Sequence, residues 1–417
     1  MRLFIRVSCL CVITYLCWLV TNDVIPENSN YSKSYREGKH KGELHMENSL
    51  ILDGHKLNWH MDKVNAWLNG ERIAPITIDC SLTANCSYRC VYCYGKLQRI
   101  NNEKPLDKDT IFRFLDDAAE IGVKAISFIS DGESTCSPHL YDAIIRGKAN
   151  GMDMALGTNG YLLKDERLEE ILALLTYLRF NISAAEKDRY TKIHGCNEKC
   201  YEKVINTIKR SVDVKKKSGI DVTIGMQMVL LPDYQDQILP LARLGKELGV
   251  DYLVIKHCGD DEEGSLGVDY QAYDGMIDVL KEAEALSDDN YIVQAKWSKI
   301  LSQGKRRYKQ CYGAPFILQI SGSGLVAACG SFFNDKYQKY HIGNIRDTSF
   351  KELWSGDRYW KVMNEIASCN FNAQKDCAAL CLQHKVNEYL WEIKHSNKQD
   401  YTEKEQCADI PMHVNFI

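Results

Sequence analysis

Three cysteines early in the chain have the spacing of ligands for an inorganic cluster. Cys86, Cys90 and Cys93 are separated by three and then two residues, and they follow an apolar run at 75–80 that predicts a strand. Thiolates suit iron–sulfur clusters, and a [4Fe–4S] cube needs four ligands. Three cysteines therefore leave one iron open to a small molecule. A zinc site would want a fourth cysteine or histidine nearby, and His60 is far upstream.

The stretch Cys86-Ser-Tyr-Arg-Cys90-Val-Tyr92-Cys93, with an aromatic residue before its last cysteine, resembles the signature of the radical S-adenosylmethionine (SAM) superfamily. The resemblance implies that the cysteines bind a [4Fe–4S] cluster whose open iron takes the amino and carboxylate groups of SAM. Reductive cleavage of SAM then yields a 5′-deoxyadenosyl radical that abstracts hydrogen from a substrate. Tyr92 is expected to cover the cluster. A zinc knuckle or unrelated buried thiols are the alternative.

Strand and helix patterns alternate along the next part of the chain. Strands are predicted at 75–80, 124–130, 153–157, 177–184, 221–230 and 251–257, and helices at 107–121, 138–150, 165–175, 199–217 and 235–248. This alternation predicts parallel βαβ units, which right-handed crossovers curl into a barrel. The expected fold class is α/β, a partial (β/α)6 TIM-like barrel with a small cysteine-rich α+β extension. Radical SAM enzymes have a partial barrel of this kind.

Chemistry in such folds lies at the carboxyl ends of the strands. After the second predicted strand, Asp131-Gly132-Glu133 resembles the Gly-Gly-Glu type motif of the family, which holds the SAM amino group. Asp131 replaces the first glycine, and Glu133 is the candidate for the methionine amine. A plain acidic turn is the alternative. Asn159, in a Thr-Asn-Gly run after the third strand, resembles a further part of the SAM site.

Three later positions complete the candidate site. Ser183 resembles the residue whose hydroxyl reaches the SAM carboxylate or ribose, although packing explains it equally well. Met228 falls where family members contact the adenine. Cys258 ends the sixth strand, where a thiol could return hydrogen to a substrate radical, and a core thiol is the alternative.

A second group of cysteines follows residue 309. Cys311 and Cys329 flank a predicted β-hairpin, and the stretches "IGNI" and "SFKELW" lead on to Cys369, Cys377 and Cys381. This region resembles the SPASM or shorter twitch extension of radical SAM enzymes. It has too few cysteines for two further cubes, so one auxiliary [4Fe–4S] cluster is expected. Cys311, Cys329 and Cys381 are the expected ligands, with Cys369 or Cys377 as the fourth. Zinc or plain thiols are the alternative.

Composition and cysteine spacing bear on the domain organisation and the cellular compartment of the protein. The chain has 417 residues, 17 cysteines and a formal net charge of −4, which gives no electrostatic reason to expect nucleic acid binding. Cysteines in metal-type spacings indicate a reducing, cytoplasmic compartment. The expected organisation is a hydrophobic segment (1–21), a polar linker (22–45), the radical SAM core (46–300), the SPASM or twitch region (301–390) and a tail (391–417).

The hydrophobic segment has three interpretations. Residues 3–20 are nearly continuous apolar sequence. They could anchor the protein at the inner face of a membrane, be a spurious extension before a true start at Met46, or be a signal peptide.

The resemblance implies the reaction class, with SAM and an electron donor such as a flavodoxin or ferredoxin. The expected function is the oxidative modification of a peptide or protein. The alternative is dehydrogenation or epimerisation of a small molecule such as a sugar or nucleotide. About thirty residues separate Met46 from the first strand, too few for a leader-recognition domain, which weakens the peptide interpretation. An iron–sulfur electron carrier or regulator is the non-enzyme alternative.

Overall fold

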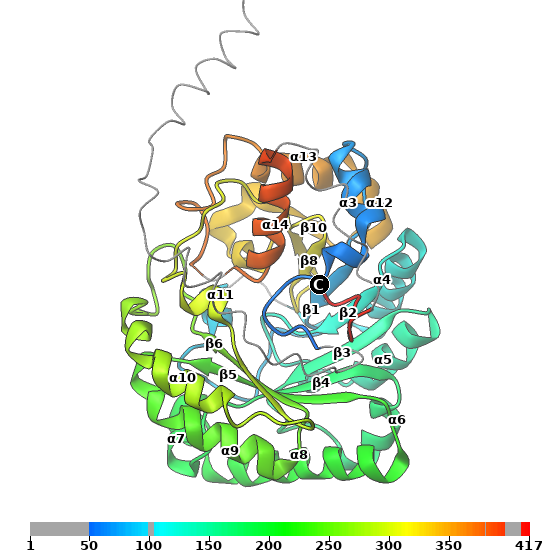
Figure 1. The fold of residues 1–417 in the computed structure, drawn as a ribbon. Helices are drawn as coiled ribbons and strands as arrows, with labels where there is room; N and C mark the ends of the chain where they lie inside the picture. Colours follow the sequence, from blue (N-terminus) through cyan, green and yellow to red (C-terminus); the bar gives the residue numbers. More distant parts are fainter. Residues whose placement is uncertain (1–49, 99–103, 380, 397–409) are drawn as a thin grey trace, which may run out of the picture. The chain divides into compact units, whose positions relative to one another are not determined.

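A computed structural model describes residues 50–98, 104–379, 381–396 and 410–417 (Figure 1). The predicted hydrophobic segment and the linker at 22–45 lie outside these residues. Within the described ranges, no helix combines the length and the apolar character needed to cross a membrane.

Ten strands of the described residues form one sheet, in the order β10-β9-β8-β1-β2-β3-β4-β5-β6-β7. Their bounds are β1 (Thr77–Cys80), β2 (Ala125–Phe128), β3 (Asp153–Thr158), β4 (Leu175–Asn181), β5 (Thr223–Leu230), β6 (Tyr252–His257), β7 (Ile292–Ala295), β8 (Ile317–Ile320), β9 (Leu325–Ala327) and β10 (His341–Asn344). Each pair from β8 and β1 through to β7 is parallel, whereas β9 and β10 are antiparallel.

The sheet confirms the predicted fold class and extends it at both edges. β1 to β6 match the six predicted strands, with ends shifted by up to three residues. Beyond them, β7 pairs with β6, and β8 pairs with β1. β7 is only four residues long and carries Gln294, so its pattern in the sequence was too weak to predict a strand. The predicted hairpin is present as β8 and β9, and it joins the cysteine-rich region to the barrel sheet.

Helices lie along the outside of the parallel strands (Figure 1). They are α4 (Lys108–Ile121), α5 (Leu140–Ala149), α6 (Leu168–Leu172), α7 (Lys187–His194), α8 (Glu198–Ser218), α9 (Ile238–Leu248) and α10 (Ile277–Glu284). The other α-helices are α3 (Met61–Leu68), α11 (Trp297–Ile300), α12 (Phe350–Ser355), α13 (Asp357–Ile366) and α14 (His384–His395). Short 3₁₀ turns occupy Leu57–Trp59, Tyr94–Leu97, Ser134–Cys136, Asp165–Arg167, Pro232–Gln237, Gln271–Met276, Gly330–Phe332 and Asp335–Tyr340.

Local sequence signals set the ends of these helices. The Asp107 side chain accepts a hydrogen bond from the amide of Thr110 at 2.8 Å and so begins α4. Gly122 ends α4 with φ of 96°, a left-handed conformation that glycine adopts without strain. Asn197 caps α8 in the same way as Asp107 caps α4.

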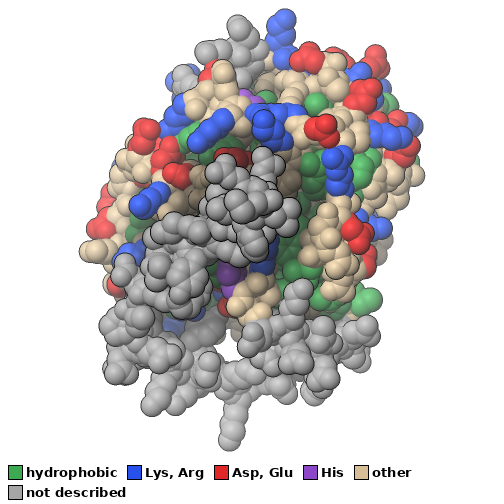
Figure 2. All heavy atoms as spheres, turned by 90° about the horizontal axis from the view of Figure 1, so that it is seen from above, with side chains coloured by type: hydrophobic (Ala, Val, Ile, Leu, Met, Phe, Trp, Pro, Cys, Tyr) green, Lys and Arg blue, Asp and Glu red, His purple; other side chains and the backbone are tan. Residues whose placement is uncertain are grey.

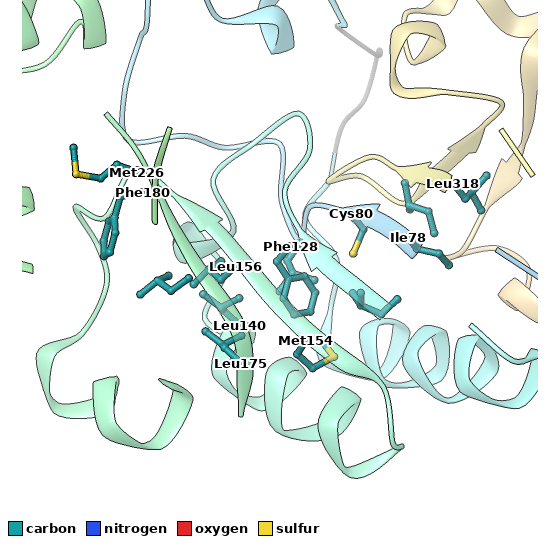
Figure 3. Close-up of a cluster of buried hydrophobic side chains, with 14 of the residues drawn as sticks. Ile78, Cys80, Phe128, Leu140, Met154, Leu156, Leu175, Phe180, Met226 and Leu318 are labelled. Atoms are coloured by element: carbon teal, nitrogen blue, oxygen red, sulfur yellow. The ribbon is translucent and has the colours of Figure 1, made fainter. Parts of the chain in front are cut away.

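Side chains alternate between the two faces of the sheet. Phe128, Leu156, Phe180 and Met226 are fully buried, and Figure 3 shows them in the hydrophobic cluster with Leu140 of α5. Side chains on the opposite face of the sheet point to the inside of the barrel and line a cavity there, among them Asp79, Ser127, Tyr177 and Arg179. The apolar face therefore holds the helices, and the inner face is left for polar groups.

The C-terminal segment, residues 410–417, closes the amino-terminal end of the barrel. The Thr77 hydroxyl, at the start of β1, donates to the carbonyl of Asn415 at 2.6 Å. The Asn415 amide donates to Asp153, at the start of β3, at 2.8 Å. The end of the chain is marked beside β1 in Figure 1. The sequence predicts a tail at 391–417, and the structure packs the last residues of this tail against the barrel.

An aromatic contact holds the same segment. The ring of Phe416 meets the ring of Tyr177 edge to face at 4.9 Å, and Phe416 is 8% exposed. The ring of His413 stacks on Tyr177 from another side, with 5.3 Å between the centroids. Burial of apolar area stabilises this arrangement.

A smaller core joins the two ends of the described chain. Leu57 and Val64, from the turn before α3 and from α3 itself, pack with Phe316, Val386 and Leu390. The last two residues lie on α14, which is drawn in red near the blue α3 in Figure 1. The cysteine-rich region is therefore packed against the start of the described chain.

Candidate functional site

The loop after β1 carries the three closely spaced cysteines. Cys86 is exposed, and Cys90 and Cys93 are partly buried. Burial, together with the neighbouring thiols, raises the pKa of Cys90 to about 12. The Cys90 thiol therefore holds its proton at neutral pH until a metal displaces it. The amide of Tyr88 donates to the Cys86 sulfur at 3.4 Å.

His194, at the end of α7, lies against this loop. Its Nδ1 is 3.4 Å from the Cys90 sulfur and 3.4 Å from the Tyr92 hydroxyl. The backbone amide of Ser183 donates to its Nε2 at 3.1 Å. Burial lowers the pKa of His194 to about 3, so the ring is neutral. The sequence around His194 does not indicate a contact with the cysteine loop, because Cys90 lies 104 residues earlier in the chain.

Glu133 is buried and is held by four hydrogen bonds at the ends of β2 and β3. Its Oε1 accepts from the amide of Thr135 at 3.1 Å, from its hydroxyl at 2.7 Å and from the hydroxyl of Thr158 at 2.8 Å. Its Oε2 accepts from the amide of Asn159 at 2.7 Å. Hydrogen bonds from neutral donors stabilise an ionised carboxylate without adding a charge. The arrangement thus presents a fixed negative charge beside the cysteine loop.

Asn159 connects the strand ends to the cysteine loop. Its side-chain amide donates to the Ser87 hydroxyl at 3.0 Å and lies 4.0 Å from the sulfur of Cys86. Its Oδ1 accepts from the amide of Tyr161 at 2.9 Å, which orients the amide group. Asn159 and Glu133 therefore lie together against the loop that carries the three cysteines.

Asp131 and Gly132, which follow β2, lie close to the hairpin turn between β8 and β9. The Asp131 carboxylate accepts from the amide of Gly322 at 2.8 Å. A side chain at Gly132 would meet the carbonyl oxygen of Thr83 at 1.9 Å. A glycine is required at this position because two loops touch there.

The other three predicted site residues are Ser183, Met228 and Cys258. The Ser183 hydroxyl is buried and accepts from the amide of Val229 at 3.1 Å. Met228 is fully buried in the core, while Gln227 next to it donates to Asn181 at 2.9 Å. Alternation along β5 therefore gives Gln227, and not Met228, to the inner face.

Cys258 is fully buried, and burial raises its pKa to about 12. Its thiol donates to the carbonyl of Gly259 at 3.5 Å. It does not line the barrel cavity among the described residues. The hydrogen-return role stays a prediction for this thiol.

Four cysteines of the C-terminal region converge. Burial, with a contribution from the nearby thiols, raises the pKa values of Cys329 and Cys377 to about 11 and about 12, and that of Cys311 even higher. Cys381 is a neighbour of all three. Cys369 is exposed beyond the end of α13 and is not among these neighbours. The geometry therefore favours Cys377 over Cys369 as the fourth ligand.

Asn387 on α14 aims an amide group at two of these thiols. Its Nδ2 donates to the sulfurs of Cys311 and Cys381, each at 3.7 Å. Its Oδ1 accepts from the amides of Tyr312 and Gly313 at 2.7 and 2.8 Å. Because the backbone occupies the oxygen, the orientation of the amide is settled, and its N–H groups face sulfur.

The donor sets fit iron–sulfur clusters. Each group consists of thiols, with an N–H group beside them, as iron–sulfur sites use. Among the described residues, no three His, Cys, Asp or Glu side chains are grouped for a single metal ion. The ligands of a cube bind separate irons and so stand further apart. The first group has three thiols with Glu133 and Asn159 beside it, and the second has four thiols.

A cavity of about 150 Å³ lies inside the barrel. Asp79, Ser127 and Arg179 line it from three strands, with Lys296 at the end of β7. Leu382, directly after Cys381, also lines it. The cavity lining thus includes the residue that follows one of the thiols of the second group.

Two family models match the chain in these regions. The radical SAM superfamily model matches residues 80–244, and the SPASM model, an iron–sulfur cluster-binding domain, matches residues 311–382. Together they include both groups of cysteines.

Curated relatives cover much of the chain. A Pyrococcus furiosus protein described as a tungsten-containing aldehyde ferredoxin oxidoreductase cofactor-modifying protein is 25% identical over 296 residues, 67% of this chain and 80% of its own. An AdoMet-dependent heme synthase of Methanosarcina barkeri is 26% identical over 312 residues, 70% of this chain and 85% of its own.

Solved structures share the fold. SuiB of Streptococcus suis, bound to S-adenosylmethionine, superposes with a TM-score of 0.56 at 14% identity, covering 85% of this chain and 77% of SuiB. SuiB bound to its precursor peptide SuiA gives the same TM-score and identity over 95% of this chain and 87% of SuiB. The chain thus belongs to the radical SAM superfamily, as an enzyme that uses a [4Fe–4S] cluster and SAM and carries a C-terminal SPASM domain for auxiliary iron–sulfur.

Proposed function

We propose that this enzyme carries out a net oxidation of its substrate. When bound, the cluster and SAM supply a radical that takes a hydrogen atom from the substrate. The observation that carries the proposal is the position of Leu382, which lines the barrel cavity directly after Cys381. A substrate in the cavity would contact the residue that follows Cys381, and an auxiliary cluster held by the SPASM cysteines could accept the second electron.

The chain's own residues have separate tasks in this proposal. Cys86, Cys90 and Cys93 hold the first cluster, and the Glu133 carboxylate, fixed by its four hydrogen bonds, receives the SAM amino group. Asn159 forms hydrogen bonds to that carboxylate and to the cysteine loop, and so sets the distance between them. Cys311, Cys329, Cys377 and Cys381 hold one auxiliary cluster. A flavodoxin or ferredoxin in a reducing, cytoplasmic compartment supplies the first electron.

A small molecule is the substrate that the geometry favours. The cavity has a volume of about 150 Å³, and residues 410–417 close the amino-terminal end of the barrel. A peptide is the second candidate, because a cavity of this size can receive a single side chain while the rest of the peptide stays outside.

Deuterium transfer tests this proposal. The source cells are grown in deuterated medium, and their extract is separated into a small-molecule and a peptide fraction. Each fraction is incubated anaerobically with reconstituted enzyme, SAM and reductant, and 5′-deoxyadenosine is analysed by mass spectrometry. Deuterium from the small-molecule fraction supports the first candidate, and deuterium from the peptide fraction supports the second.

The control and the contrary outcome are defined by the same assay. A variant with Cys86, Cys90 and Cys93 all replaced by Ala should form no 5′-deoxyadenosine from either fraction. Net oxidation also requires that the auxiliary cluster be reduced during turnover, which electron paramagnetic resonance detects. Deuterium transfer without any such reduction would contradict the oxidation and indicate a redox-neutral reaction.

A further inference from the structure

The inner face of the barrel carries more basic than acidic side chains among the described residues. Arg179 on β4 and Lys296 after β7 line the cavity together with Asp79 on β1. Lys256, at the end of β6, lies close enough to Arg179 and Asp79 for their charges to affect its pKa. The cationic groups thus come from three strands that are far apart in the sequence.

Arg179 has a polar atom that the described residues leave unsatisfied. Its Nε is buried and has no hydrogen-bond partner within the described part of the chain. Its guanidinium lies 5.8 Å from the centre of the Tyr177 ring, a contact that does not use the N–H group. A buried N–H without a partner costs free energy unless something binds to it.

Lysine side chains add to this charge. Burial, and then the neighbouring cations, lower the pKa of Lys256 to about 7 and that of Lys296 well below its usual value. The ammonium groups of Lys256, Lys296 and Lys299 form no hydrogen bond or ion pair with any described residue. Each lysine is thus held as a cation only at a cost, unless a partner arrives.

Two carboxylates of the described chain face these four cations. Asp79 lies deep in the barrel, and burial raises its pKa to about 7, so it is only partly ionised near neutral pH. Asp53 accepts from the amide and the hydroxyl of Ser298 at 2.9 and 2.5 Å, and its charge acts on Lys296 and Lys299. When all four basic groups are protonated, they outnumber these carboxylates even if both carboxylates are ionised.

We propose that Arg179, Lys256 and Lys296 bind an anionic group of the substrate, a carboxylate or a phosphate, inside the barrel. An anion would satisfy the guanidinium N–H and offset the cationic excess in one step. The inference rests on the proposed function in one respect, that the substrate occupies this cavity. It adds the chemical class of the group that enters.

Direct binding of simple anions tests the site without turnover. Reconstituted enzyme with SAM and no reductant is titrated by calorimetry with succinate and, separately, with inorganic phosphate, at an ionic strength held constant with chloride. One of the two should bind with a Kd of about 10 mM or lower, and the tighter of them identifies the class. Lys256→Met and Lys296→Met should each weaken that binding by about ten-fold or more, because a charge-assisted hydrogen bond is lost.

Lys217→Met is the matched control, since Lys217 is an exposed lysine near the end of α8 and should leave anion affinity unchanged. If neither anion binds, or if Lys256→Met and Lys296→Met both bind as tightly as the wild type, the proposal is overturned. Because no SAM cleavage is needed, this result can fail while the deuterium assay succeeds, and the reverse also holds.

Melting temperature in anion-free buffer gives a second measurement. Methionine keeps most of the lysine's apolar length and removes the buried charge, so Lys256→Met and Lys296→Met should raise the melting temperature. A lower melting temperature in both variants would mean that the chain already compensates these cations, and it would overturn the proposal.

Discussion

The backbone amide of Ser183 donates a hydrogen bond to Nε2 of His194 at 3.1 Å. A neutral imidazole carries one proton, so accepting at Nε2 assigns that proton to Nδ1. Nδ1 faces the sulfur of Cys90 at 3.4 Å. His194 is therefore oriented to donate an N–H group to a thiolate of the first cluster.

His194→Phe should lower the reduction potential of the first cluster. An N–H group beside a thiolate stabilises the more negative, reduced cluster, and phenylalanine keeps the ring but loses the donor. The expected shift is roughly 20–60 mV, the one-electron equivalent of about 0.5–1.5 kcal/mol for one hydrogen bond. A potentiometric titration followed by electron paramagnetic resonance measures it. Equal potentials in wild type and His194→Phe would exclude the role.

Glu133→Gln should weaken SAM binding by roughly ten- to a hundred-fold, because a charge-assisted hydrogen bond contributes about 1.5–3 kcal/mol. The single NH2 group of the amide would also face either the amide of Asn159 or the donors of Thr135 and Thr158, so the melting temperature should fall. Equilibrium binding of SAM to the reconstituted protein provides the measurement. Thr135→Val removes one hydrogen bond, that of the hydroxyl, but keeps the carboxylate, and it should retain most of the affinity. Unchanged affinity in Glu133→Gln would remove this residue from the site.

Cys377 and Cys369 form a matched pair of cysteines for testing the auxiliary cluster. The wild type should hold about eight irons per chain after anaerobic reconstitution, four in each cube. Cys377→Ala should lower the count toward about four, whereas Cys369→Ala should leave it near eight, because the Cys369 thiol is exposed and apart from the others. Iron and zinc analysis measures both. A loss with Cys369→Ala and none with Cys377→Ala would reverse the assignment.

Phe416→Ala should destabilise the protein, since the Phe416 ring is packed on Tyr177 and is 8% exposed. Removal of a buried aromatic side chain costs about 3–5 kcal/mol. Scanning calorimetry under anaerobic conditions should show a lower melting temperature. Ile410→Ala is the control, because Ile410 is 64% exposed and should change little. Equal stability of the two variants would show that the segment does not hold the barrel closed.

Several features of this protein could be predicted from the sequence because their signals are local. Cys86, Cys90 and Cys93 lie within eight residues, so their spacing alone indicates a shared ligand. The strand and helix periods of β1 to β6 lie within single segments, and the structure confirms them. The Asp131–Glu133 stretch was found because strand ends meet at one edge of a parallel sheet.

Other features depended on contacts between distant segments, which local patterns do not encode. His194 reaches Cys90 across 104 residues, and Asn387 reaches Cys311 across 76. The choice between Cys369 and Cys377 depended on how the chain after α13 returns to β8. The sequence determined which residues could do the chemistry, because ligand type and spacing are local properties. Only the tertiary structure decided which of them meet, since register and side-chain alternation bring Arg179, Lys256 and Lys296 to one face of the sheet.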